Sequence, residues 1–253
     1  MRVQDFPACV DTTPSSFTSY TLNGKSEQLS WVILFPVLAT PGYYLLPLLL
    51  QKQMLIQIVP QLLAYLGFAA WSQHNTHVIH RLGLAPRGFW LGLRRGSLVG
   101  IILGTWNTLM ILWAIPMVGG EIAFLQDTPH AKAPTLLMVP WGILSIAIAV
   151  ELNFRGFLLG RLLVLTDRYL PTAARQYQWA AMVACLLSVG ISSLLFSFDP
   201  FMVSTFHSLH WIALWDGCIW GWLWVRFRNL YMVITAHAVE VIVLYVSLKT
   251  ALT

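Results

Sequence analysis

The chain has 253 residues, of which 57% are hydrophobic and 10% are charged, and its mean hydropathy is +0.69. A soluble domain usually carries roughly 25% charged residues, so this composition excludes an ordinary cytosolic enzyme, and so much apolar surface also excludes a disordered chain. The net charge of +5 is spread over the segments between apolar runs. This distribution is typical of a membrane orientation signal and not of a nucleic-acid-binding patch.

Residues 1–28 are polar and rich in Ser and Thr, and we expect them to form a short flexible cytoplasmic tail without a cleavable signal peptide. The rest of the chain consists largely of apolar runs close to the roughly 20 residues that cross a bilayer. They predict transmembrane helices near residues 30–50, 53–72, 96–118, 135–165, 179–197, 211–225 and 230–248. The expected fold class is therefore all-α, a polytopic membrane protein of about seven transmembrane helices, with residues 29–253 forming a single transmembrane domain.

Two of these runs have unusual features. The fourth run is longer than one straight crossing requires, so we expect it to be broken or to extend beyond the bilayer. The sixth run and its flanks are rich in tryptophan, and we interpret most of these side chains as lipid-interface anchors. They are Trp211, Trp215, Trp220, Trp222 and Trp224.

Apart from Arg155, the basic residues fall into two sets of segments that alternate along the chain. One set of segments contains Arg2, Lys25, Arg81, Arg87, Arg94, Arg95, Arg161, Arg168, Arg175, Arg226 and Arg228. The other set contains Lys52, Lys132 and Lys249. Because cytoplasmic loops carry the excess of Lys and Arg, this pattern predicts a cytoplasmic N-terminus and a C-terminus on the opposite side.

The cysteine and histidine spacings favour no metal site. Cys9, Cys185 and Cys218 are far apart and form no CxxC or Cys/His pattern, so neither a thiolate zinc site nor a disulfide framework is expected. Three histidines spaced by threes could bind a metal from one helical face, but no carboxylate is near them, and we interpret them as solvated interfacial side chains. These are His74, His77 and His80.

Ionisable groups inside spans cost about 2.5–3.5 kcal/mol each, so each of them requires a reason. Glu151 and Arg155 are spaced i, i+4, which allows their side chains to pair on one helix. One interpretation is that they only neutralise each other. The other is that His237 lies at a similar depth and shares a cytoplasm-facing cavity with Glu151, where a carboxylate and an imidazole can activate water.

Two aspartates outside this group have structural interpretations. Asp216, at the start of the sixth run, is expected to cap a helix or to form an interhelical hydrogen bond. The dipeptide Asp199–Pro200 is typical of a helix stop followed by a turn.

The segment from Val150 to Leu158, VELNFRGFL, resembles the first motif, EExxFRGFL, of the CPBP family, which comprises type II CAAX prenyl endopeptidases and bacteriocin-processing (Abi) membrane proteins. Residues 215–240 resemble the last two spans of that family. Their pattern G…GW…R…NL…H falls on Gly217, Gly221, Trp222, Arg226, Asn229, Leu230 and His237. The resemblance covers about residues 80–245 and implies a CPBP-like helical bundle with an intramembrane protease site, in which the matching catalytic residues are Glu151, Arg155 and His237.

Three polar positions of that site are replaced in this sequence. Val150 stands where the family has the first Glu, which is taken to activate the hydrolytic water, and Pro200 stands at the His of an FxxxH motif. Val241 stands at the later Asn, four residues after His237. Since a general base and oxyanion donors each contribute several kcal/mol to hydrolysis, these replacements argue against proteolysis.

Substitutes for the lost groups are conceivable. Phe206 to His210 also reads FxxxH, although it precedes the sixth run on the predicted outer side, so His210 is a possible catalytic residue. His207 and His210 also leave open a metal or cofactor site on the outer face. Glu240 is one residue short of the Asn position and points about 100° away from it on a helix.

Two functions therefore stay open. The first is a non-proteolytic pseudoenzyme of CPBP type that acts as a scaffold for other membrane proteins, with Glu151 and Arg155 joining helices. The second is an active CAAX-type intramembrane endopeptidase, in which Glu151 is the base and His237, with His210 as a further candidate, stabilises the oxyanion. A transporter is disfavoured because the sequence has no inverted repeat. The expected partners are the lipid bilayer and other membrane proteins, not nucleic acid, and the sequence identifies no particular cofactor.

Overall fold

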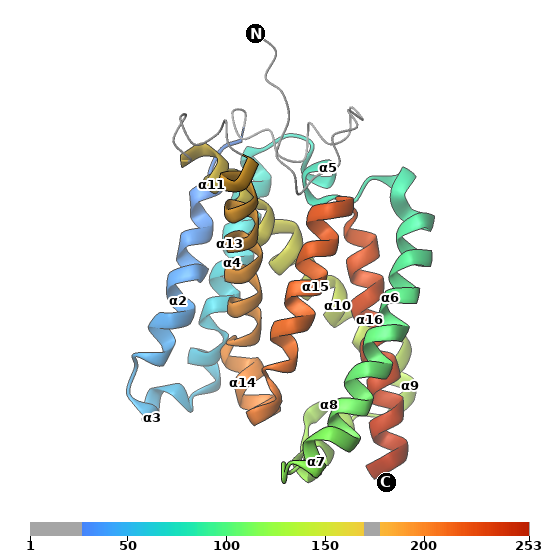
Figure 1. Ribbon diagram of the computed structural model, residues 1–253. Helices are drawn as coiled ribbons and strands as arrows, with labels where there is room; N and C mark the ends of the chain where they lie inside the picture. Colours follow the sequence, from blue (N-terminus) through green and yellow to red (C-terminus); the bar gives the residue numbers. More distant parts are fainter. Residues whose placement is uncertain (1–26, 170–177, 253) are drawn as a thin grey trace. The chain divides into compact units, whose positions relative to one another are not determined.

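The computed structural model describes residues 27–169 and 178–252, and within these ranges the chain forms helices and no strands (Figure 1). The predicted all-α fold class is therefore confirmed. The predicted polar tail, residues 1–28, lies outside the described residues except for Glu27 and Gln28. Cys9 also lies outside them.

Five helical segments are long and apolar enough to cross a membrane. They are Met54–His74, Val78–Met117, Ile143–Tyr169, Trp179–Ser197 and Leu230–Leu252. The first predicted run, 30–50, is divided into shorter pieces because the helix ends at Tyr44, ahead of Pro47. The sixth forms a helix of 16 residues, which is shorter than a usual crossing. The protein is an integral membrane protein, and the total of seven spans stays a prediction.

The described residues form two compact units, each built from two stretches of the chain. Unit 1 comprises Met1–Ala85 and Leu152–Arg228, and unit 2 comprises Pro86–Glu151 and Asn229–Thr253. In unit 1 the structure shows 3-10 turns η2 (Ser30–Ile33) and η8 (His207–Leu209), the π-helix η7 (Leu152–Leu159), and α2 (Leu34–Tyr44), α3 (Leu48–Gln51), α4 (Met54–His74), α5 (Val78–Leu82), α11 (Gly160–Tyr169), α13 (Gln178–Ser197), α14 (Pro200–Phe206) and α15 (Ile212–Phe227).

Aromatic side chains form much of the core of unit 1. Phe157 of η7 is fully buried, and its ring lies 5.7 Å from that of Trp71 on α4. Trp224 of α15 is also fully buried, and its Nε1 donates a hydrogen bond to the carbonyl of Leu82. Trp220 is buried as well, so the interface-anchor interpretation is wrong for Trp220 and Trp224. These two rings pack against protein because they face the inside of the unit.

Unit 2 is organised around two long helices that lie side by side (Figure 1). They are α6 (Phe89–Leu109) and α16 (Leu230–Leu252). The remaining elements are η3 (Pro86–Gly88), η5 (Ala123–Asp127), the π-helices η4 (Met110–Ala114) and η6 (Met138–Gly142), and α7 (Ile115–Met117), α8 (Pro129–Lys132), α9 (Thr135–Leu137) and α10 (Ile143–Glu151).

A row of glycines on α6 lets these two helices approach closely. Glycine recurs at every fourth position from Gly88 to Gly104, so the row follows one face of the helix. A Cβ atom on Gly100 would lie 2.5 Å from the carbonyl oxygen of Ala236. Small residues at such spacing are typical of close helix pairs in membranes. At the end of the pair, Asn229 donates to the carbonyl of Gly88 and accepts from the amide of Met232, so it also caps α16.

The fourth apolar run is helical without a gap from Thr135 to Tyr169, so the predicted break is wrong, although the type of helix changes along the run. It is α-helical in α10 and α11 but π-helical over Leu152–Leu159, which contains the FRGFL motif. A π-helical segment inside an α-helix is rare and is frequently found at functional sites. The i, i+4 pairing expected for Glu151 and Arg155 assumes an α-helix, but the α-helix ends at Glu151 and the π-helix begins at Leu152. The two residues fall in different units, and their pairing stays a prediction.

Candidate functional site

The carboxylate of Glu151 and the imidazole of His237 meet inside unit 2. Glu151 is the last residue of α10, and His237 lies two turns into α16. The Nδ1 atom of His237 is 2.7 Å from Oε1 of Glu151, a hydrogen-bonding distance. Glu151 is fully buried, and 7% of His237 is exposed. The structure thus brings together two of the three residues that the sequence predicts for the site.

A second buried polar pair lies in the same unit. Glu240 follows His237 by three residues on α16, so the two side chains are near neighbours on one side of that helix. The amide nitrogen Nδ2 of Asn107 on α6 donates a hydrogen bond of 2.7 Å to Oε1 of Glu240. Asn107 is absent from the sequence-based candidates. The signal that identifies it is its position, three residues after Gly104, on the face of α6 that approaches α16.

The replaced family positions in unit 2 carry apolar side chains in packing roles. Val241 packs against a buried cluster formed by Met138, Ile143, Ala147 and Ala238. Val150, one residue before Glu151, is partly buried. Neither valine can donate or accept a proton, so these two positions contribute no acid–base chemistry.

Arg155 lies in unit 1, where aromatic rings surround its guanidinium. The guanidinium carbon is 4.6 Å from the centre of the Phe196 ring and 5.0 Å from that of Trp220. Cation–π contacts of this kind stabilise a buried arginine. A Cβ atom on Gly217 would lie 3.2 Å from Nη2 of Arg155, so glycine leaves the room that the guanidinium occupies. Arg155 therefore contacts side chains of α13 and α15.

Asp199 and Pro200 form a helix stop and a new start. Helix α13 ends at Ser197, and Pro200 is the first residue of α14. The Oδ1 atom of Asp199 accepts hydrogen bonds from the amides of Phe201 and Met202, which makes Asp199 the N-cap. The predicted stop and turn is confirmed. Pro200 suits this position because a proline at the first helical residue needs no hydrogen-bond partner for its nitrogen.

The histidines outside unit 2 are placed as follows. His74 ends α4, His77 precedes α5 with a positive φ of 58°, and His80 lies within α5. A single helical face for these three residues is therefore wrong, because the chain turns between the two helices. His210 lies in unit 1, where its Nδ1 is 2.6 Å from the carbonyl oxygen of His207. Among the described residues, no group of three or more His, Cys, Asp or Glu side chains is arranged to hold a metal ion.

Asp216 does not cap its helix. The N-cap of α15 is Trp211, and Asp216 lies five residues further on, buried inside the helix. The capping interpretation is wrong because the helix begins at Ile212, four residues before Asp216. The alternative, an interhelical hydrogen bond, stays a prediction.

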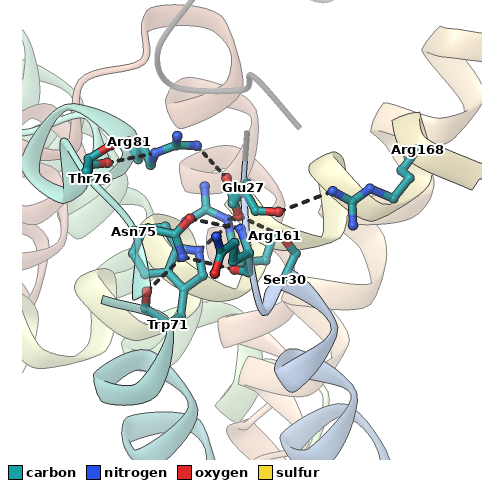
Figure 2. Close-up of polar contacts among 9 residues, drawn as sticks. Glu27, Ser30, Trp71, Asn75, Thr76, Arg81, Arg161 and Arg168 are labelled. Atoms are coloured by element: carbon teal, nitrogen blue, oxygen red, sulfur yellow. Dashed lines mark hydrogen bonds and ion pairs between the residues drawn. The ribbon is translucent and has the colours of Figure 1, made fainter. Parts of the chain in front are cut away.

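Glu27 is the centre of a buried polar cluster in unit 1 that the sequence analysis did not identify (Figure 2). Its Oε1 atom accepts hydrogen bonds from Ser30 Oγ at 2.9 Å and from Trp71 Nε1 at 3.0 Å. Its Oε2 atom forms an ion pair with Nη1 of Arg81 at 3.0 Å. Arg161 forms a second ion pair with Oε1. All four partners converge on one carboxylate that has no exposed surface.

Two further contacts complete this cluster. The guanidinium of Arg161 stacks over the Trp71 ring at 4.1 Å, and Arg168 donates a hydrogen bond to the main-chain carbonyl of Glu27. Figure 2 shows these arginines directed toward Glu27 from α5 and α11. The cluster therefore fastens the start of the described chain to α4, α5 and α11. Its three arginines all belong to the segments that the sequence analysis assigns to one side of the membrane.

Comparison with known proteins identifies one family. Residues 132–243 match the family model of type II CAAX prenyl endopeptidase Rce1-like proteins. The matched region contains the VELNFRGFL segment and His237, and the match confirms the resemblance to the CPBP family. No curated protein and no solved structure matches the chain significantly.

Proposed function

We propose that this integral membrane protein, whose residues 132–243 match the Rce1-like family model, does not cleave peptide bonds. In this proposal it acts as a scaffold for other membrane proteins. The observation that carries the proposal is the burial and hydrogen bonding of Glu151, the carboxylate of the family motif that this chain retains. Glu151 is buried and hydrogen-bonded to His237, whereas valine occupies the position that activates water in the family.

Peptide hydrolysis needs a base that reaches a water molecule and donors that stabilise the developing oxyanion. Val150 supplies no base, and Val241 is part of an apolar cluster. Glu151 and His237 instead join α10 to α16, as an interhelical hydrogen bond does in a membrane bundle. In this proposal the family's catalytic groups persist as structural contacts of unit 2.

The basic residues of the loops support an orientation for this scaffold. The segments rich in Lys and Arg, which include Arg81, Arg161 and Arg168, lie on the cytoplasmic side together with the N-terminus. The Glu27 cluster then fastens the N-terminal segment at the cytoplasmic end of unit 1. The C-terminus is on the opposite side.

One observation favours a second function, an active CAAX-type intramembrane endopeptidase. Glu240 is a second buried carboxylate close to His237 in sequence and on the same helix, and Asn107 orients it through a 2.7 Å hydrogen bond. In that function Glu151 is the base, His237 stabilises the oxyanion, and the Glu240–Asn107 pair replaces the polar groups that Val150 and Val241 remove.

The two functions predict different sets of protein N-termini when cells lack this protein. We would compare protein N-termini by mass spectrometry in cells that carry the wild type, a deletion or Glu151→Gln, with the exposed Glu121→Gln as the matched control. The scaffold predicts the same set of N-termini in all four strains, and membrane proteins that co-purify with the wild type. N-termini that require both the protein and Glu151 would identify a protease and its substrates.

A further inference from the structure

Asp199 in unit 1 is a buried carboxylate without a cationic partner among the residues that the structure describes. It is 2% exposed, and its Oδ1 atom accepts hydrogen bonds from the side chain of Gln61 and from the main-chain amides of Phe201 and Met202. No Lys, Arg or His of the described ranges pairs with it. Burying a charge is costly unless it is paired, so this carboxylate must take up a proton or acquire a cation from solution.

A small pocket lies beside this carboxylate. Its lining combines residues of α2, α4, η7 and α13 with Asp199, and most of the wall is apolar. The polar side chains of the lining are Thr40, Gln61, Asn153 and Asp199. The free space accommodates about one particle of the size of a water molecule. A ligand of this pocket is therefore small.

The polar groups of the pocket are mostly acceptors. The Oδ1 atom of Asn153 has no hydrogen-bond partner although the residue is 2% exposed. The hydroxyl group of Thr40 donates a hydrogen bond to the carbonyl of Pro36, so the lone pairs of Oγ1 can accept or coordinate. The side-chain amide nitrogen of Gln61 donates a hydrogen bond to Asp199, and the side-chain oxygen of Gln61 is an acceptor. A small ligand bound in the pocket would satisfy the unpartnered Oδ1 atom of Asn153.

A cation suits this set of groups better than a neutral molecule. Oxygen atoms of carboxylate, amide and hydroxyl groups are the ligands that hard cations prefer. The pocket holds one carboxylate, so one positive charge neutralises it, whereas a divalent ion would leave an excess charge in apolar surroundings. We propose that this pocket binds one sodium ion, with Asp199, Asn153 and Thr40 as its protein ligands.

The experiment measures binding of radioactive ²²Na⁺ to the purified full-length protein in choline chloride buffer. The wild type should show one saturable site. Asp199→Asn should abolish saturable binding while keeping the helix cap, because Asn caps helices as well as Asp does. Asn153→Ala removes one ligand of the ion. It should weaken sodium binding at least about tenfold, because this is the effect of losing one good polar contact.

The matched control is Asp127→Asn, which removes a carboxylate that is 81% exposed and paired with Lys132. It should bind sodium as the wild type does. The proposal is overturned if the wild type shows no saturable site, or if Asp199→Asn binds sodium equally well. If Asp199→Asn does not fold, Asn153→Ala decides, and unchanged binding in that variant also overturns the proposal.

Discussion

The Nδ1 atom of His237 lies 2.7 Å from the carboxylate of Glu151, and this contact joins the end of α10 to the middle of α16. In the proposed function, this carboxylate and imidazole are the remainder of an acid–base site in which Val150, Pro200 and Val241 stand at the other polar positions of the family motifs. The same contact is also an interhelical hydrogen bond inside unit 2. The predictions below separate these two roles and test the other contacts on which the account depends.

Glu151→Ala should destabilise the protein by about 1–3 kcal/mol, because it leaves the buried His237 without this partner. The measurement is the free energy of unfolding of the purified protein in detergent. Glu121→Ala, which removes an exposed carboxylate of the same unit, is the control and should change little. Equal stabilities of the two variants would show that the Glu151–His237 contact joins no helices.

Gly100→Ala should destabilise the protein by about 1–3 kcal/mol, because the added methyl group would lie 2.5 Å from the carbonyl oxygen of Ala236 and force α6 away from α16. Gly190→Ala makes the same change inside α13, where a Cβ atom meets no atom within 4 Å. The control should be neutral or slightly stabilising, since alanine favours helix more than glycine. Thermal unfolding of both variants tests this, and a loss at Gly190 that matches the loss at Gly100 would contradict it.

Glu27→Ala should destabilise the protein by about 3–5 kcal/mol, because two buried arginines lose the carboxylate that neutralises them. Asp127→Ala breaks the exposed pair with Lys132 and should cost at most about 1 kcal/mol. Chemical denaturation of the two variants gives the comparison. A loss at Glu27 as small as that at Asp127 would mean that the cluster does not fasten the N-terminal segment.

Asp199 should make stability depend on pH in sodium-free buffer. Because the pKa of Asp199 is raised from 3.8 to about 6, the folded state binds the proton more tightly than the unfolded chain between these values. Its contribution is therefore fully present below about pH 4 and is lost as the pH rises to about 6, by about 3 kcal/mol in total. The difference in unfolding free energy between the wild type and Asp199→Asn should follow this curve. A difference that is constant from pH 4 to pH 7 would contradict it.

The sequence predicts those features that depend on local pattern. Long apolar runs identify the membrane helices, and the Asp199–Pro200 dipeptide identifies a helix stop. The meeting of Glu151 and His237 follows from a family motif combined with their estimated depths. Each of these inferences requires only residues that are close in sequence or matched to a known pattern.

The remaining features depend on contacts between distant residues. Asn107 and Glu240 are 133 positions apart, and although the glycine row places Asn107 on the face of α6 that approaches α16, no local pattern identifies Glu240 as its partner. Glu27 lies in a polar segment that resembles a solvated tail, although its arginine partners are buried. Trp220 and Trp224 belong to a tryptophan-rich run that we interpreted mostly as lipid-interface anchors. Composition does not distinguish an anchor from a buried ring, because lipid and the protein interior are both apolar. The π-helix at Leu152–Leu159 has no periodic signal of its own.

The measurement that tests the central claim most directly is peptide hydrolysis by the purified protein in liposomes, followed with a library of internally quenched peptides. We expect the wild type and Glu151→Gln to give the same background rate, because Glu151 serves as a contact between helices and not as a base. A wild-type rate above that of Glu151→Gln, with Glu121→Gln as active as the wild type, would contradict the account and establish a protease.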